Sequence, residues 1–118
     1  MVERKRTMQE PTLLLLTALA DAPRHGYALA QEVQAISHGR VRLRTGTLYG
    51  SLERLQQEGL VEVFSEERVE GRLRRTYALT ADGRQVLAEE ARRLAATARE
   101  ATRRLKKAVG DDPAGALA

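Results

Sequence analysis

The chain has 118 residues, a formal net charge of +4 and no cysteine. This length suits one small domain with an appendage, and the lack of cysteine excludes disulfide bonds and thiolate-based metal or catalytic sites. The basic balance favours a polyanionic partner. The apolar run at residues 13–20 is too short to span a bilayer, and Thr17 interrupts it. We therefore expect a cytoplasmic protein without membrane contacts.

The N-terminal part predicts a flexible arm over residues 1–7 and a helix over residues 8–21. Thr7 and Glu10 have the spacing of a capping box, and Pro11 is tolerated in a first helical turn. The middle of this helix is apolar on every side, which requires cover on more than one face. Because a small domain offers little cover, we expect a partner chain to supply one face.

A second helix is predicted over residues 26–37, with His25 capping its start and Gly39 ending it. Residues 41–43 alternate like a very short strand. The apolar stripe of this helix consists of Tyr27, Ala30 and either Val33 or Gln34. We therefore expect Tyr27 to lie in the core.

The third helix is predicted to begin at or near Thr45 and to end before a C-terminal glycine, Gly59. Leu48, Leu52 and Leu55 recur at helical spacing and should pack inward. Another side carries small polar groups and a cation, and such a helix can enter a DNA major groove. The residues expected to read bases are Thr45, Thr47, Ser51 and Arg54.

Two residues of this helix allow two interpretations each. Tyr49 is either a half-buried ring or a phosphate contact. Gly50 costs the helix about 1 kcal/mol relative to alanine. Either a close approach of DNA or a tolerated surface glycine would explain it.

Residues 60–64 and 72–79 are predicted as two strands joined by a polar loop, which makes a hairpin. Thr80 then caps a long helix over residues 81–109, and residues 110–118 are expected to form a disordered tail. Apolar positions of the long helix alternate steps of four and three, as in a heptad seam. These positions include Leu87, Ala91, Leu94, Ala98, Ala101 and Leu105.

Arginines form two clusters on either side of the third helix. The stretch from residue 33 to 52 has no acidic side chain. Charge runs are usually ordinary solvated faces, but the position of these clusters favours phosphate contacts. The predicted phosphate contacts are Arg42, Arg44, Arg72 and Arg74, whereas Arg75 is either a DNA contact or part of an ion pair. The hairpin loop is expected to contain three acidic residues, Glu66, Glu67 and Glu70. Their carboxylates would repel phosphate.

The sequence offers no catalytic constellation. His25 and His38 are the only histidines and have no clustered carboxylates near them, so neither suggests a metal site. Glycine-rich phosphate loops and hydrolase motifs are missing. We expect a protein that is not an enzyme and needs no metal or cofactor.

An ordered set of short motifs resembles the PadR family of transcriptional regulators. The motifs lie at residues 25–27, 46–49, 52–55, 59–61 and 71–83. The resemblance implies a homodimeric winged helix, usually a repressor, whose C-terminal helix packs against the partner's N-terminal helix. Gly50, Leu73 and Thr76 depart from the family pattern, the first in the third helix and the other two in the wing.

Together these observations predict a mainly α fold with a small β-hairpin: a winged helix-turn-helix domain at 8–80 and a dimerisation helix at 81–109. The expected function is a homodimeric, DNA-binding repressor on an inverted-repeat operator. The alternative is a winged helix that contacts protein rather than DNA. A small-molecule effector in the dimer cavity is left open. The expected dimer contacts are Leu13, Leu14, Leu16, Leu87, Ala91, Leu94, Ala98, Ala101 and Leu105.

Overall fold

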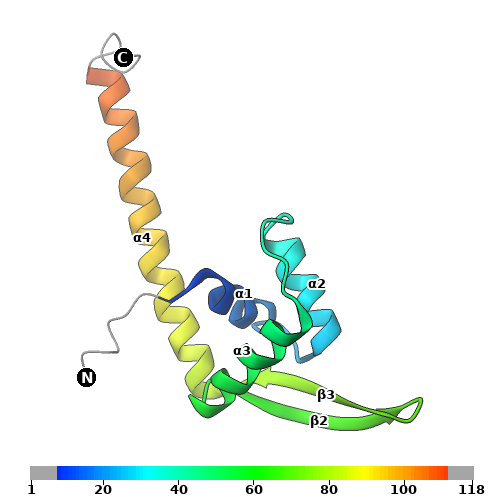
Figure 1. The fold of residues 1–118 in the computed structure, drawn as a ribbon. Helices are drawn as coiled ribbons and strands as arrows, with labels where there is room; N and C mark the ends of the chain where they lie inside the picture. The colour runs from blue at the N-terminus through cyan, green and yellow to red at the C-terminus, as the bar shows by residue number, and fades with distance from the viewer. Residues whose placement is uncertain (1–7, 112–118) are drawn as a thin grey trace. The chain divides into compact units, whose positions relative to one another are not determined.

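A computed structural model of the chain describes residues 8–111 and contains a winged helix-turn-helix domain (Figure 1). One compact unit ends at Leu87 and a second begins at Ala88, so the start of the last helix belongs to the first unit. The mainly helical fold with a small antiparallel sheet confirms the predicted fold class. The elements are α1 (Glu10–Ala18), β1 (Arg24–His25), α2 (Gly26–Ile36), α3 (Thr45–Gln57), β2 (Val61–Val69), β3 (Arg72–Leu79) and α4 (Ala81–Asp111).

The sheet has three antiparallel strands in the order β1-β3-β2. Its short edge strand is Arg24–His25, which pairs with Tyr77 and Thr76 of β3. The strand predicted at residues 41–43 is wrong, because that segment is irregular. There the Val41 amide donates to Ser37 Oγ at 3.0 Å, so a buried serine at the end of α2 holds the segment.

The leucine run of α1 is buried by its own chain. Leu14 is 6% exposed and Leu16 is fully buried within the single chain, so little of either side chain is left for the predicted dimer contact, which stays a prediction. Leu13 is half-buried. Cover comes from the other helices and the sheet, whose apolar residues join α1 in one core. The buried apolar residues are Leu14, Leu15, Leu16, Ala18, Leu19, Leu29, Val33, Leu48, Leu52, Leu55, Val61, Tyr77 and Leu79.

The first helix is shorter than predicted. It begins at Glu10 after Gln9, whose side chain makes no capping bond, and Thr7 of the expected capping box lies outside the described residues. Pro11 lies in the first turn, as predicted. The helix ends at Ala18, where the Leu19 amide turns to the Leu16 carbonyl at 3.1 Å.

Tyr27 does not lie in the core, contrary to the prediction. It is 69% exposed, whereas Leu29 and Val33 form the buried face of α2. His25 caps this helix as expected, accepting a bond from the Ala28 amide at 3.5 Å. Tyr27 lies in the first turn of α2 and lines a cavity instead.

Left-handed residues end both helices of the helix-turn-helix. After α3, Gly59 has φ 78°, and its amide donates to the Gln56 carbonyl at 3.0 Å, which confirms the predicted C-terminal glycine. After α2, the equivalent position is His38, with φ 55°, and Gly39 follows it. The sequence therefore identified the end of α2 correctly but assigned its key conformation one residue late.

The hairpin is longer than predicted. β2 continues to Val69, and the turn consists only of Glu70 and Gly71, both with positive φ as a tight two-residue hairpin turn requires. Glu66 and Glu67 lie in the strand, not in a loop. They looked like loop residues because they are acidic, but each faces an arginine of β3. A register shift between Val63 and Ser65 marks a bulge.

The last helix begins with a well-defined cap and extends two residues beyond the predicted end. The Gly83 amide donates to Thr80 Oγ1 at 2.9 Å, and that hydroxyl donates to the Gly59 carbonyl at 2.6 Å. Leu87 packs partly against the core of its own unit, which limits its predicted role in dimer contact. From Ala91 to Val109 the apolar positions are exposed. Residues 112–118 of the predicted tail lie outside the described residues.

Within residues 8–111, no helix combines the length and the hydropathy needed to span a bilayer.

Gly83 fixes how closely the start of α4 approaches the chain before β2. An added Cβ would overlap the Leu60 carbonyl oxygen and lie 2.9 Å from the carbonyl carbon. Gly83→Ala is therefore expected to destabilise the protein by about 1–3 kcal/mol, because backbone must move. Thermal unfolding followed by circular dichroism should show a fall in Tm of roughly 4–8 °C per kcal/mol.

The matched control is Gly50→Ala in the middle of α3, where an added Cβ meets nothing within 4 Å. There alanine should raise stability by about 1 kcal/mol through helix propensity. An unchanged Tm for Gly83→Ala would show that α4 does not depend on this close approach.

Candidate nucleic-acid interface

The outer face of α3 is exposed, and two of its residues are glycines. Helical spacing places Gly46, Gly50, Glu53 and Gln57 opposite the three buried leucines, and all four are exposed. A Cβ added at Gly46 or Gly50 would meet no atom within 4 Å, so folding does not require glycine at either position. A surface of this kind lets another molecule approach the helix backbone closely.

The predicted base-reading residues do not share this outer face. Thr45 and Thr47 are exposed, whereas Ser51 is half-buried on the flank of the helix. Arg54 is turned toward α1, where its Nη2 donates to Thr12 Oγ1 at 2.9 Å. Its Nη1 also lies 3.5 Å from a carboxylate oxygen of Glu58. Helical spacing alone could not reveal this, because the side chain crosses to a neighbouring helix.

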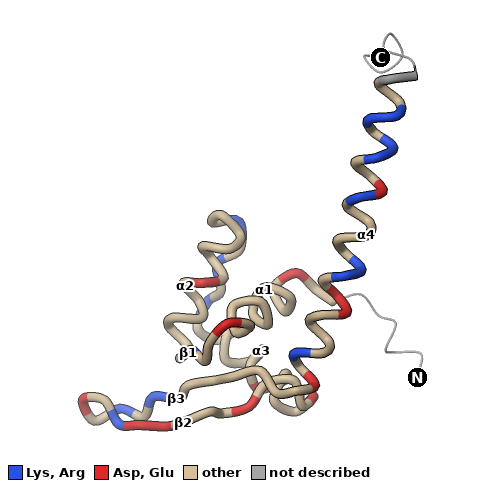
Figure 2. Tube along the Cα trace, turned by 180° about the vertical axis from the view of Figure 1, so that it is seen from behind, with Lys and Arg blue, Asp and Glu red and all other residues tan. Residues whose placement is uncertain are grey.

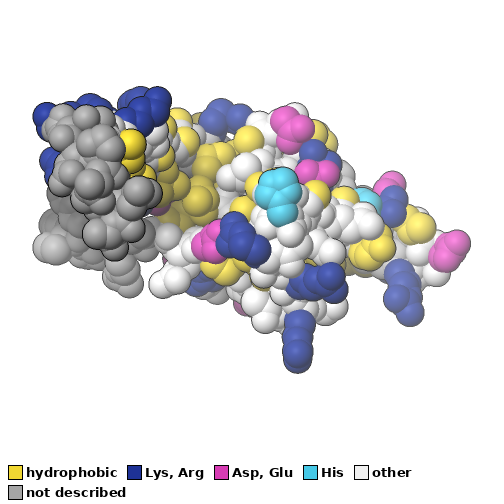
Figure 3. All heavy atoms as spheres, turned by 90° about the horizontal axis from the view of Figure 1, so that it is seen from above, with side chains coloured by type: hydrophobic (Ala, Val, Ile, Leu, Met, Phe, Trp, Pro, Cys, Tyr) yellow, Lys and Arg dark blue, Asp and Glu magenta, His cyan; other side chains and the backbone are white. Residues whose placement is uncertain are grey.

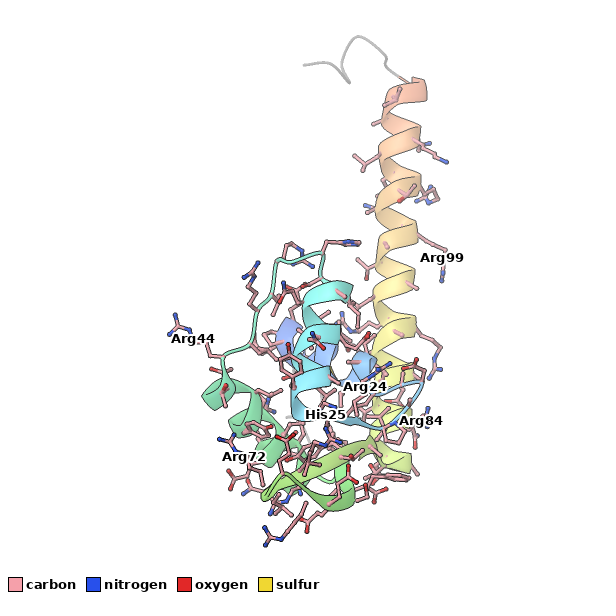
Figure 4. All side chains as sticks on the ribbon, turned by 90° about the vertical axis from the view of Figure 1, so that its right-hand side faces the viewer. Arg24, His25, Arg44, Arg72, Arg84 and Arg99 are labelled. Atoms are coloured by element: carbon pink, nitrogen blue, oxygen red, sulfur yellow. The ribbon has the colours of Figure 1, made fainter. Side chains whose placement is uncertain are left out.

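The loop between α2 and α3 carries two free cations and one engaged cation. Arg40 donates to Glu10 at 2.8 Å, and this hydrogen bond lowers the pKa of the Glu10 carboxyl. Arg42 and Arg44 are exposed, and neither forms an ion pair within residues 8–111. In Figure 4 the Arg44 side chain projects away from the ribbon at the start of α3. Both residues are therefore available to a polyanion.

The wing is largely neutralised by its own acids. Arg74 pairs with Glu67 at 2.9 Å and Arg75 pairs with Glu66 at 2.7 Å, directly across the two strands. Figure 2 shows basic and acidic residues close together along this hairpin. Arg72 has no ion pair within the described residues and is labelled in Figure 4. Of the two roles left open for Arg75, the structure shows the ion pair, and Arg74 is paired as well.

Arg68 is a second arginine near the wing tip, besides Arg72, and it was not predicted from the sequence. Arg68 faces Leu73 in the strand register, and its Nη1 lies 3.4 Å from the Gly71 carbonyl oxygen. It has no acidic partner within residues 8–111. Its place beside two glutamates made it look like part of an ordinary polar loop. On the face shown in Figure 3, most basic side chains away from the grey region stand out singly rather than as one continuous patch.

A cavity of about 230 Å³ lies between α3, the start of α2 and the wing. Tyr49 from α3 lies over Gly26, where an added Cβ would be 2.7 Å from the tyrosine Cζ. Tyr77 is only 3% exposed; burial raises its pKa, and Arg75 opposes that rise. The residues lining the cavity are His25, Gly26, Tyr27, Tyr49, Leu73, Arg74, Arg75 and Tyr77.

Tyr49 thus has a structural position, since its ring packs against α2, but it is also 44% exposed. The half-buried ring that the sequence offered as one interpretation is therefore seen, and the phosphate contact that it offered as the other stays a prediction. Among residues 8–111, no group of three or more His, Asp or Glu side chains is placed to hold a metal ion.

Comparison with known proteins gives a consistent result. The model of the "Transcriptional regulator PadR-like family" matches residues 15–89, which is more than half of the chain. The transcriptional regulator Rv3488 of Mycobacterium tuberculosis is 45% identical over 89 residues, which cover 75% of this chain and 78% of that protein. These matches include the helix-turn-helix and the wing.

Two further similarities differ in extent. A 37.1 kDa protein of unknown character in transposon TN4556 of Streptomyces fradiae is 42% identical over 83 residues, covering 70% of this chain. The chain spans only 22% of the length of that protein. The structure of Bacillus subtilis PadR in complex with operator DNA superimposes with a TM-score of 0.61 at 18% identity, covering 69% of this chain and 47% of that one. This last likeness supports the fold.

Proposed function

The chain belongs to the PadR-like family of transcriptional regulators, and we propose that it acts by binding double-stranded DNA with α3 and the loop before it. One observation carries the proposal: the outer face of α3 is open at Gly46 and Gly50. Arg42 and Arg44, which have no ion pair among the residues that the structure describes, lie immediately before it. An open helix face beside free cations suits entry into a major groove with phosphate contacts at the rim.

In this proposal the side chains divide into two groups. Thr45 and Thr47, which are exposed at the start of α3, contact base edges. Arg42, Arg44 and Arg72 contact phosphates, because they are exposed and have no acidic partner in the described part of the chain. Ser51, Arg54 and Arg74 contribute less, since they are half-buried or already bonded within the chain.

We further propose that the protein is a homodimer held together through α4. Leu94 is 39% exposed and Leu105 is 69% exposed, and the seam between them is alanine-rich. A water-exposed heptad seam on a helix of 31 residues favours pairing with a second copy. Two-fold symmetry of the dimer then implies an inverted-repeat operator.

Repression is the proposed sense of regulation, because a dimer bound over a promoter blocks access to it. A regulator of this kind acts on chromosomal DNA, which places it in the cytoplasm. Release by a small-molecule effector stays a prediction from the family resemblance.

The proposal is tested by footprinting the wild-type protein on the DNA upstream of its own gene. We expect two symmetric protected half-sites whose centres lie about 34–36 Å apart, or a multiple of this, on one face of the duplex. Uniform protection along the fragment, or none, would contradict sequence-specific regulation.

Glu53 lies on the outer face of α3 and has no ion pair within the described residues. Its carboxylate repels phosphates, so its presence on a DNA-facing helix is unfavourable for non-specific binding, although it can accept a bond from a cytosine amino group. Glu53→Gln should strengthen binding to scrambled DNA about 3-fold at low salt and narrow the discrimination between sequences. Fluorescence anisotropy on both duplexes measures this.

Glu89→Gln makes the same charge change at an exposed position of α4. It should leave both affinities close to those of the wild type. Equal gains from the two substitutions would show that Glu53 acts only through net charge and does not face the groove.

A further inference from the structure

The cavity between α3 and the wing has donors but no acid among its lining residues. It lies between the two elements that the proposed function places on DNA. A DNA strand that passes from a groove occupied by α3 toward the wing must cross this region. The chemistry of the cavity therefore bears on the sugar–phosphate backbone rather than on bases.

Three polar groups of the cavity are free to donate. His25 Nδ1 accepts from the Ala28 amide at 3.5 Å, which leaves Nε2–H as the donor of the neutral ring. Tyr27 Oη accepts from Gln31 Nε2 at 3.3 Å, so its own hydrogen has no acceptor within residues 8–111. Tyr49 Oη has no hydrogen-bond partner in that part of the chain, and the tyrosine residue as a whole is 44% exposed.

The two arginines of the cavity are already neutralised. Glu67 binds Arg74 and Glu66 binds Arg75, so the net charge of the lining and its immediate partners is close to zero. The neutral donors of His25, Tyr27 and Tyr49 are thus available to an anion beside the arginine N–H groups that these pairs leave unused. A phosphate diester accepts hydrogen bonds through two oxygens and offers none, which matches a site with several donors and no acid among its lining residues.

We propose that this cavity binds one DNA backbone phosphate through the side chains of Tyr27, Tyr49 and His25. The inference rests on the proposed DNA-binding function and assigns the His-Gly-Tyr motif and Tyr49 to it. Gly26 is part of the device, because any larger residue there would displace the Tyr49 ring. Neutral donors add affinity without releasing counterions, so this site contributes a part of the binding that salt does not weaken.

The test uses Tyr27→Phe and Tyr49→Phe with a duplex carrying the protected segment of the upstream DNA. Each variant should bind about 10- to 100-fold more weakly, as expected for the loss of one hydrogen bond in each half-site of the dimer. The slope of log affinity against log salt should stay unchanged. Gln31→Ala is the matched control, because it removes the neighbour of Tyr27 and keeps the hydroxyl; its affinity should equal that of the wild type.

A second arm locates the phosphate. Each duplex in a series carries one neutral methylphosphonate at a different backbone position. At one position per half-site, the modification should lower the affinity of the wild type, whereas it should hardly lower the already reduced affinity of Tyr27→Phe. Equal losses for wild type and variant at every position would overturn the proposal. A second result would also overturn the proposal. It is that free inorganic phosphate shifts the His25 NMR resonances of the wild type while both phenylalanine variants bind DNA with wild-type affinity.

These outcomes separate the two proposals. Wild-type protein that binds its upstream DNA, with phenylalanine variants that bind equally well, rejects the cavity alone. Wild-type protein that fails to bind DNA rejects the proposed function and the cavity with it.

Discussion

Simultaneous replacement of Arg42, Arg44 and Arg72 by alanine is expected to weaken DNA binding about 100-fold or more near physiological salt. These arginines are exposed and have no acidic partner within residues 8–111. In a dimer all six copies would contact phosphates, and each contact contributes about 0.9 to the salt slope. For the triple variant, the slope of log affinity against log salt concentration should therefore be smaller in magnitude by up to about 5. Anisotropy titrations over a range of salt concentrations measure this slope.

The control changes the same number of charges elsewhere. Arg93, Arg103 and Arg104 are ion-paired with glutamates along α4. Their replacement by alanine alters net charge equally but should change affinity and slope far less. Equal effects of the two triple variants would mean that the protein attracts DNA only through its overall charge. The loop before α3 and the wing tip would then have no special role.

Replacement of Leu94 and Leu105 by aspartate is expected to give monomers that no longer bind the operator tightly. Both leucines are exposed in the single chain, so the substitutions should leave the first unit folded. The seam between them is rich in alanine and buries little area per residue, so two buried carboxylates should suffice to break it. Operator affinity should fall about 100-fold or more, because each half-site then binds alone.

Light scattering measures the mass, and circular dichroism checks the fold. Ala96→Asp is the control, since this exposed alanine lies outside the heptad seam; it should remain dimeric. A double aspartate variant that still runs as a dimer would place the interface on another surface, and Leu13, which is half-buried on α1, would be the first residue to test there.

Local rules predicted much of the fold. The leucine spacing of α3, the glycine after it and the Thr80 cap depend on residues near in sequence, and the structure confirms each. Errors arose where the partner is distant. Glu66 and Glu67 read as loop residues because their partners, Arg75 and Arg74, lie on the facing strand.

The candidate site was predictable only in outline. The sequence identified α3 and the arginines around it, but it could not fix the rotation of the helix about its axis. The buried leucines set that rotation, which puts Gly50 and Glu53 outward and Ser51 on the flank. Likewise, Arg54 left the predicted set because its side chain reaches Thr12 of α1.

Three glycines illustrate why residue type alone is ambiguous. Gly83 and Gly26 are required by atoms of the chain itself, the Leu60 carbonyl and the Tyr49 ring. A Cβ added at Gly50 would meet no atom within 4 Å, so the fold does not explain why a glycine stands in the middle of this helix. Under the proposed function, the duplex is what approaches it, and the departure of Gly50 from the family pattern acquires a physical meaning.

The central claim is that α3 and its flanking arginines recognise a specific DNA sequence. The most direct measurement is a salt titration of the wild-type protein on its own upstream DNA beside a scrambled duplex of equal length. We predict steep salt dependence on both, with an affinity for the upstream DNA at least about 1,000-fold higher at physiological salt. Equal affinities for the two duplexes at every salt concentration would contradict the claim.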